Sequence, residues 1–127
     1  NGGVLVGTAV TGADGSYYFG GLNDTNMTSG SLLYNTNYEV SVSLSDANLT
    51  GLALTTQDAA GIISNDNKTD LADSDAAESG GNAVIAFATG GPGENNHTLD
   101  IGFVPRISIG SYIWEDSNAN GAQDGGE

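Results

Sequence analysis

Short runs in which apolar and polar residues alternate, separated by glycine-rich turns, constrain this chain more than any other feature. Residues 37–44 read N-Y-E-V-S-V-S-L, so apolar side chains recur at every second position. This period of two is that of a β-strand, whose successive side chains point to opposite faces of a sheet. We therefore expect the apolar members, Tyr38, Val40 and Val42 among them, to face a core and the polar ones to face solvent.

Six further segments carry a strand signal. They are residues 4–10, 16–19, 49–56, 83–88, 97–104 and 107–114, bounded by turn-forming residues. The Asp14-Gly15 pair between the first two is typical of a hairpin turn. About seven short strands, with no helix of useful length, predict an all-β fold and a β-sandwich. The length of 127 residues fits one such domain.

The composition excludes several partners and chemistries. Sixteen acidic residues stand against two basic ones, for a formal net charge of −14. Nucleic acids and anionic membrane surfaces require clustered Lys and Arg, so neither is an expected partner. The chain contains no apolar run long enough for a membrane span and no cysteine for disulfides or thiolate metal sites. It also lacks the residue patterns of hydrolase nucleophiles, so we expect no enzyme activity.

The last twelve residues, D-S-N-A-N-G-A-Q-D-G-G-E, follow the pattern of a twelve-residue calcium loop. Oxygen ligands fall at positions 1, 3, 5, 7, 9 and 12, as Asp116, Asn118, Asn120, the backbone carbonyl of Ala122, Asp124 and Glu127. Gly121 occupies position 6, where a sharp turn requires a residue without Cβ. A strand carrying Trp114 precedes the loop, where an EF-hand has a helix. The sequence therefore predicts calcium in an EF-type loop on a β scaffold, with a solvated turn as the plainer alternative.

A second acidic cluster lies between residues 65 and 75. Its four carboxylates are Asp66, Asp70, Asp73 and Asp75. Such carboxylates repel one another unless water or cations separate them. The spacing follows no fixed template, so two interpretations stay open: a second calcium site that orders this segment, or a mobile charged loop.

The segment 109–127, I-G-S-Y-I-W-E-D-S-N-A-N-G-A-Q-D-G-G-E, strongly resembles the opening strand and calcium loop of SdrD B-like domains. Three further pieces are similar to the same family: T-G-A-D-G-S-Y-Y-F-G-G-L at 11–22, D-S-D-A at 73–76 and T-L-D-I-G-F-V at 98–104. These domains occur in serine-aspartate repeat adhesins and other bacterial surface proteins. The resemblance implies an immunoglobulin-like sandwich of Greek-key topology, stiffened by calcium and repeated in tandem. It also implies that the loop side chains are calcium ligands, and that Asp73 and Asp75 match the family's second acidic cluster.

The order of these motifs departs from that family, in which the strand and calcium loop open a domain. Here they close the chain, which divides into residues 1–105, a sandwich lacking its first strand, and residues 106–127, a strand with the calcium loop. Three arrangements stay open: an out-of-frame period of a tandem array, completion of a neighbouring subunit by strand addition, or folding back onto the same domain. The first two predict end-to-end assembly and a hydrophobic groove in residues 1–105.

Five Asn residues stand in the N-x-S/T pattern that marks N-glycosylation: Asn23, Asn26, Asn48, Asn67 and Asn96. A chain rich in Asn and Thr also generates this pattern by chance, so two interpretations stay open: glycosylation at these positions, or chance occurrence of the motif. 

Strand spacing predicts core positions for the aromatic residues Tyr17, Phe19, Tyr38, Phe87, Phe103 and Trp114. It leaves Tyr18, Tyr34 and Tyr112 for a ligand-binding face, if the domain has one. His97 is expected on the surface.

These features predict a structural role outside the cell. The chain is expected to be a calcium-stiffened repeat or subunit of a stalk, fibre or filament, joined end to end with copies of itself or with tandem neighbours. The alternative is an adhesin or carbohydrate-binding module of a bacterial surface protein or secreted enzyme, with a host protein or glycan as its ligand. An accessory domain of a secreted enzyme is a third interpretation.

Overall fold

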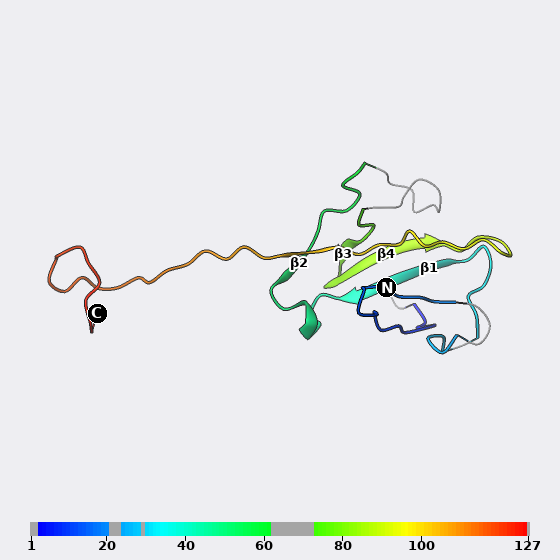
Figure 1. Ribbon diagram of the computed structural model, residues 1–127, viewed down its shortest axis with the longest axis horizontal. Helices are drawn as coiled ribbons and strands as arrows, with labels where there is room; N and C mark the ends of the chain where they lie inside the picture. The colour runs from blue at the N-terminus through cyan, green and yellow to red at the C-terminus, as the bar shows by residue number, and fades with distance from the viewer. Residues whose placement is uncertain (1–2, 21–23, 29, 62–72, 127) are drawn as a thin grey trace.

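The computed structural model describes residues 3–20, 24–28, 30–61 and 73–126 (Figure 1). Its elements are β1 (Asn37–Ser43), the 3-10 helix η1 (Ala47–Leu49), β2 (Leu52–Leu54), β3 (Ala77–Ser79), β4 (Asn82–Ala88) and β5 (Phe103–Pro105). These strands pair antiparallel throughout, so the described chain is all-β, as the sequence predicts. No helix among the described residues is long and apolar enough to cross a membrane.

The larger sheet has the order β1-β4-β3 and follows from the alternating patterns of its strands. Exposed and half-buried residues alternate along all seven positions of β1, with Tyr38 and Val40 turned inward. Val40 pairs with Ile85 of β4, which is 1% exposed. The turn from β3 to β4 consists of Gly80 and Gly81 at φ of 57° and 80°, a conformation that glycine adopts without strain.

The smaller sheet pairs β2 with β5, and residues of both sheets meet in the core. The fully buried hydrophobic residues of the described chain are Ala76, Ala83 and Ile85. Partly buried residues packed against them are Val40, Val42, Leu44, Leu54, Leu99, Ile101 and Phe103. Because two of the three buried residues are alanines, the core of this part, residues 3–105 and called the body below, is thin.

Two expected strands near the N-terminus are wrong. Residues 4–10 make only an isolated bridge, between Gly7 and Met27, and residues 16–19 join no sheet of the described chain. The turn between them is present, since the Gly12 N–H donates to the Ser16 carbonyl at 2.8 Å. A turn depends on local residues, whereas a strand also requires a partner in register.

Of the strands expected between residue 37 and the end of the body, two are confirmed almost in full and two only in part. The segments 37–44 and 83–88 correspond to β1 and β4 almost residue for residue. The segment 49–56 contains the shorter β2, and of 97–104 only its end lies in β5. The long alternating patterns therefore predicted the central pair of strands best.

Residues 107–114, called the arm below, are a further correction, because the expected last strand is unpaired. The arm lies extended beyond β5 and points away from the body (Figure 1). Arg106 fixes its base: the backbone N–H donates to the Gly51 carbonyl at 2.8 Å, and Nε donates to the Leu52 carbonyl at 2.6 Å. The arm therefore leaves the body from the end of the smaller sheet.

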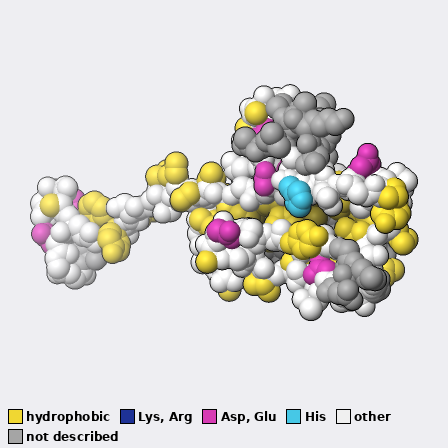
Figure 2. Space-filling model, turned by 45° about the vertical axis from the view of Figure 1, so that its right-hand side comes forward, with side chains coloured by type: hydrophobic (Ala, Val, Ile, Leu, Met, Phe, Trp, Pro, Cys, Tyr) yellow, Lys and Arg dark blue, Asp and Glu magenta, His cyan; other side chains and the backbone are white. Residues whose placement is uncertain are grey.

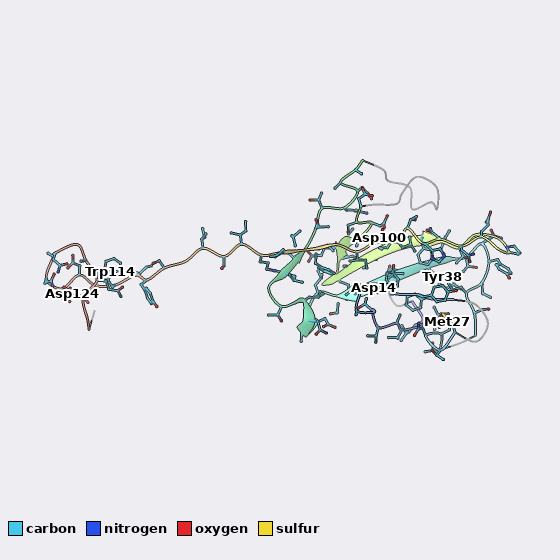
Figure 3. All side chains as sticks on the ribbon, in the orientation of Figure 1. Asp14, Met27, Tyr38, Asp100, Trp114 and Asp124 are labelled. Atoms are coloured by element: carbon cyan, nitrogen blue, oxygen red, sulfur yellow. The ribbon has the colours of Figure 1, made fainter. Side chains whose placement is uncertain are left out.

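Trp114 is wrongly expected in the core. It lies at the far end of the arm, away from the body (Figure 3). The other aromatic residues expected in the core are half-buried in the body: Tyr17, Phe19, Tyr38, Phe87 and Phe103.

Candidate functional site

The C-terminal loop, residues 116–126 of the described chain, folds around the carboxylate of Asp116. Its Oδ1 accepts from the Asn120 N–H at 3.1 Å, and its Oδ2 accepts from the Gly121 N–H at 2.9 Å. Ala119 and Gly121 adopt positive φ of 57° and 78°, which turns the backbone tightly at this point. The first predicted calcium ligand is thus oriented by backbone donors of its own loop.

The other side-chain ligands gather at the same place. Asp124 Oδ2 accepts from the Nδ2 atoms of Asn118 and Asn120, each at 2.7 Å. Asn120 Oδ1 in turn accepts from the Ala122 N–H at 2.7 Å. The structure therefore brings together Asp116, Asn118, Asn120 and Asp124 as the sequence spacing predicts, with Ala122 beside them.

The donor set of this loop fits calcium, which takes six to eight hard oxygen ligands in irregular geometry. Two carboxylates and two side-chain amides supply such oxygens. Turning an amide about its last bond exchanges its nitrogen for its oxygen, so both Asn side chains can present oxygen instead of N–H to a cation. The bidentate ligand Glu127 lies outside the described residues. Within them, no three His, Cys, Asp or Glu side chains are close enough to hold a metal, so a calcium ion in the loop would need amide and carbonyl oxygens as well as carboxylates.

The loop and the arm stand in solvent, where Trp114 is an internal reporter. Every described residue from 104 to 126 is exposed, and the large apolar side chains of the arm are 77–102% exposed except for Trp114 at 40%. Trp114 stands two positions before Asp116, the first residue of the loop, and Figure 3 labels it at the loop end of the arm. Its indole therefore lies where a change in the loop alters its surroundings.

The second acidic cluster contains a buried carboxylate with an unpaired oxygen. Asp75 is 2% exposed; its Oδ2 accepts from the Asp100 N–H, whereas its Oδ1 has no hydrogen-bond partner. Asp73 is half-buried and accepts from the Ala60 N–H at 2.8 Å. Asp66 and Asp70 lie outside the described residues. Burial of an unpaired charged oxygen is costly, so this position favours a cation as its partner.

Asp100 joins this cluster, although the sequence reasoning missed it. Burial, followed by the charges of Asp75 and Asp73, raises the pKa of Asp100. Burial and the charges of Asp100 and Asp75 likewise raise the pKa of Tyr17 to about 12. Asp100 is 25 positions from Asp75, so no local spacing connects them. The one available signal was a carboxylate inside the run 99–104, whose other residues are apolar or glycine.

The glycosylation candidates differ in access. Asn48 lies exposed in η1. Asn26 Nδ2 donates to the Tyr18 carbonyl at 2.9 Å. Asn96 Oδ1 accepts from the hydroxyl of Thr98, its own sequon residue, which is 1% exposed. Asn23 and Asn67 lie outside the described residues. Among the described positions, Asn48 is therefore the most accessible acceptor.

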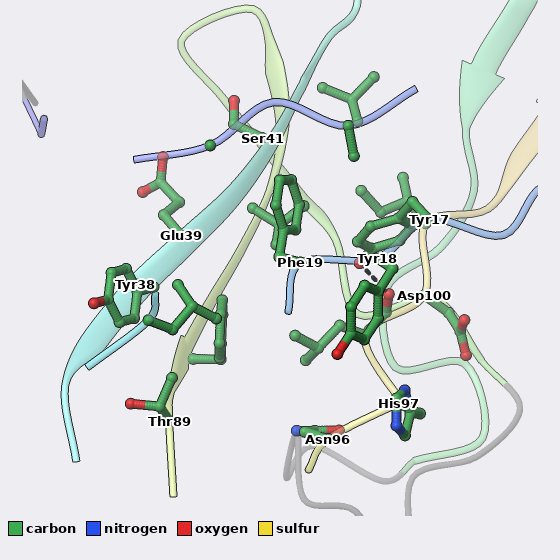
Figure 4. Close-up of a pocket in the computed structure, with 18 of the residues that line it drawn as sticks. Tyr17, Tyr18, Phe19, Tyr38, Glu39, Ser41, Thr89, Asn96, His97 and Asp100 are labelled. Atoms are coloured by element: carbon green, nitrogen blue, oxygen red, sulfur yellow. Dashed lines mark hydrogen bonds between the residues drawn. The ribbon is translucent and has the colours of Figure 1, made fainter. Parts of the chain in front are cut away.

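The aromatic residues expected on a ligand face are not gathered together. Tyr18 is 54% exposed and stacks on exposed His97, with ring centroids 6.5 Å apart and planes 18° from parallel (Figure 4). Tyr34 is exposed elsewhere on the body, and Tyr112 lies on the arm. The structure thus offers one small exposed aromatic pair, formed by Tyr18 and His97.

Part of this sequence is similar to serine-aspartate repeat-containing proteins of staphylococci. The chain is 35% identical over 65 residues to protein F of Staphylococcus epidermidis, and 36% identical over 66 residues to protein I of Staphylococcus saprophyticus. It is 49% identical over 37 residues to protein D of Staphylococcus aureus strain Newman. These matches cover 50%, 50% and 28% of this chain but only 4%, 4% and 3% of the relatives. No protein-family model and no solved structure matches. The similarity supports a relationship to the serine-aspartate repeat proteins over half of the chain.

Proposed function

We propose that this chain is a repeat or subunit of an extracellular stalk, fibre or filament, stiffened by calcium in its C-terminal loop and joined end to end with further copies. The observation that carries the proposal is the gathering of Asp116, Asn118, Asn120 and Asp124 in one loop. The relatives are named serine-aspartate repeat-containing proteins, and the matching segment covers only 3–4% of each, which supports the view of this chain as one segment of a long surface protein. Their place among bacterial surface adhesins, which the resemblance implies, supports a non-enzymatic role at the cell surface.

The loop geometry explains why calcium suits this role. Asp116 is already oriented by two backbone N–H groups, so little further ordering is needed for it to bind an ion. The bound ion supplies positive charge to a chain whose formal net charge is −14, which lowers the repulsion among its carboxylates. Because the loop adjoins Trp114, ordering of the loop also orders the end of the arm.

A calcium titration followed by tryptophan emission tests the proposal. The chain has one Trp, so the signal comes from Trp114 alone. We expect a saturable change that EDTA reverses, and we expect Asp116→Ala to abolish it. Asp14→Ala is the matched control, because Asp14 is an exposed carboxylate that also accepts from a backbone N–H in a turn, at the other end of the chain. No saturable change in the wild-type chain would refute the calcium role.

The exposed pair of Tyr18 and His97 favours a carbohydrate-binding module as the second candidate function, because sugars stack on exposed aromatic rings. A glycan array probed with the intact chain distinguishes the two functions. Binding that is lost in Tyr18→Ala and retained in Tyr34→Ala supports the module. No binding at all leaves the structural repeat as the better account.

A further inference from the structure

The body contains an open cavity that is much larger than the voids of a fully packed protein core. This cavity, called the hollow below, has a volume of about 1740 Å³. Aromatic and aliphatic side chains line it, among them Tyr17, Phe19, Tyr38, Val40, Phe87 and Phe103 (Figure 4). Protein interiors pack with few voids larger than a water molecule, and a space of this size holds tens of them. The apolar lining therefore calls for further apolar side chains.

The hollow borders an unpaired strand edge. In the order β1-β4-β3, the strand β1 is terminal and pairs on one side only within the described part of the chain. Beside it lies a second cavity of about 570 Å³, between residues 3–7 and the residues Asn37, Tyr38, Glu39 and Ser41. An unpaired edge carries N–H and C=O groups that can hydrogen-bond to an added strand. The body thus has both an edge to pair with and space beside it.

The arm has the pattern of the strand that this site lacks. Its residues 107–113 are as many as the seven of β1, and they are extended and unpaired. Ile107, Ile109 and Ile113 are 94%, 96% and 102% exposed. With the strand period of two, they share one face, as do the inward residues of β1. Hydrophobic side chains are accordingly prominent along the arm and over the body (Figure 2).

We infer that the arm of one copy adds as a strand to the free edge of β1 of a second copy and places its isoleucines in the hollow. This inference rests on the proposed end-to-end role and names the surfaces that form the joint. Ser108 and Tyr112 then lie on the outer face, beside Glu39 and Ser41.

A second copy suits the site better than the chain's own arm. Arg106 is fixed to Gly51 and Leu52, and from there the arm runs away from the body (Figure 1). To reach its own β1, the chain has to reverse its direction just after Arg106. A turn at that point includes the residues around Ile107, and these residues have to be extended if they are part of the docked strand. An arm that continues outward meets another body without any reversal.

Cysteine cross-linking between copies tests the joint, since the chain has no cysteine of its own. Ser41→Cys marks the outer face of β1, and Ser108→Cys marks the outer face of the arm. A mixture of the two single variants with a short bis-maleimide is expected to give cross-linked heterodimers. Ser79→Cys, on the opposite edge strand β3, replaces Ser41→Cys in the control mixture and is expected to give far fewer. Equal yields in both mixtures would overturn the inference.

Two further measurements test the alternatives, in which the chain's own arm fills the hollow or no arm does. A single chain carrying both Ser41→Cys and Ser108→Cys should cross-link within itself only at background level; efficient, concentration-independent cross-linking within one chain means that the arm folds back, and overturns the inference. In sedimentation velocity, Ile109→Asp should raise the apparent Kd of self-association about tenfold or more. Val10→Asp, at an apolar position 90% exposed outside both cavities, is the matched control and should leave the Kd unchanged. A wild-type chain that stays monomeric at high concentration contradicts the joint.

Running these experiments in calcium and in EDTA distinguishes the joint from the calcium role. A monomeric chain whose Trp114 emission still responds to calcium refutes the joint and leaves the calcium loop standing. A chain that associates through the arm without any calcium response supports the joint and refutes the calcium loop.

Discussion

Calcium is expected to raise the unfolding temperature of the body only at protein concentrations where the arm is docked on another copy. The loop and the arm are exposed throughout, and the hydrogen bonds that orient Asp116 and Asp124 come from residues of the loop itself. Ligand binding stabilises a folded unit only when unfolding of that unit destroys the site. Calcium in an isolated loop on an extended arm is therefore expected to leave the stability of the body of the same chain unchanged.

The size of the effect follows from linkage. At a calcium concentration 100-fold above Kd, one site adds about 2.7 kcal/mol to the unfolding free energy of the unit that contains it. For a chain of this length that corresponds to a rise in Tm on the order of 10 °C. This prediction takes the docked arm and its loop to unfold together with the body that they join. The expected rise is then about 10 °C in the associated state and close to zero in the monomeric state.

Differential scanning calorimetry at low micromolar and at near-millimolar protein concentration, each in calcium and in EDTA, measures both states. Ile109→Asp is the control, since it keeps the calcium loop intact and weakens docking. Its Tm should not respond to calcium at either concentration. A full rise in Tm in a sample shown to be monomeric by sedimentation would refute the reasoning, because calcium would then couple to the body within one chain.

Three further predictions concern the body. Ile85→Ala should cost about 2–5 kcal/mol of stability in urea unfolding, because Ile85 is 1% exposed, whereas the same deletion at the exposed Ile113 should cost the monomer nothing measurable. Gly102→Ala should lower stability by about 1–3 kcal/mol, since a Cβ at that position meets the Thr55 methyl at 2.7 Å; Gly91→Ala, whose nearest contact is an ordinary 3.7 Å, is its control, and equal stability of the two contradicts the packing argument. Burial and neighbouring carboxylates raise the pKa of Asp100 in the folded state, so its charged form destabilises the body at neutral pH. This loss of stability shrinks as the pH falls through the raised pKa of the folded state toward the ordinary Asp pKa near 4. In EDTA, Asp100→Asn should therefore be more stable than wild type at pH 7, with the difference shrinking toward pH 4; a difference that grows on acidification has the wrong sign for this account.

The sequence predicted what depends on local pattern. β1 and β4 follow from long alternating runs, and the loop follows from ligands that lie within twelve consecutive positions. Residues 4–10 have the same composition of β-branched residues, yet they lack a partner strand in the described chain beyond the single bridge at Gly7. Strand formation there depends on register between distant segments, which a single sequence does not display.

The buried acidic cluster shows the same limit. The pair formed by Asp75 and Asp100 depends on how two distant segments meet, and Asp75 N–H also donates to the Asp100 carbonyl at 2.9 Å. Asp100 is exposed on the body, and its N–H donates to Asp75 Oδ2. Only the fold reveals this contact with a carboxylate 25 positions away in the sequence. Whether calcium occupies this second cluster stays a prediction.

The most direct test of the account is a crystal structure of the intact chain grown in calcium, with the ion located by its anomalous scattering. The account predicts a peak enclosed by Asp116, Asn118, Asn120 and Asp124, and an arm paired with β1 of a neighbouring copy. An ordered C-terminal loop without an anomalous peak between these four side chains would contradict its central claim.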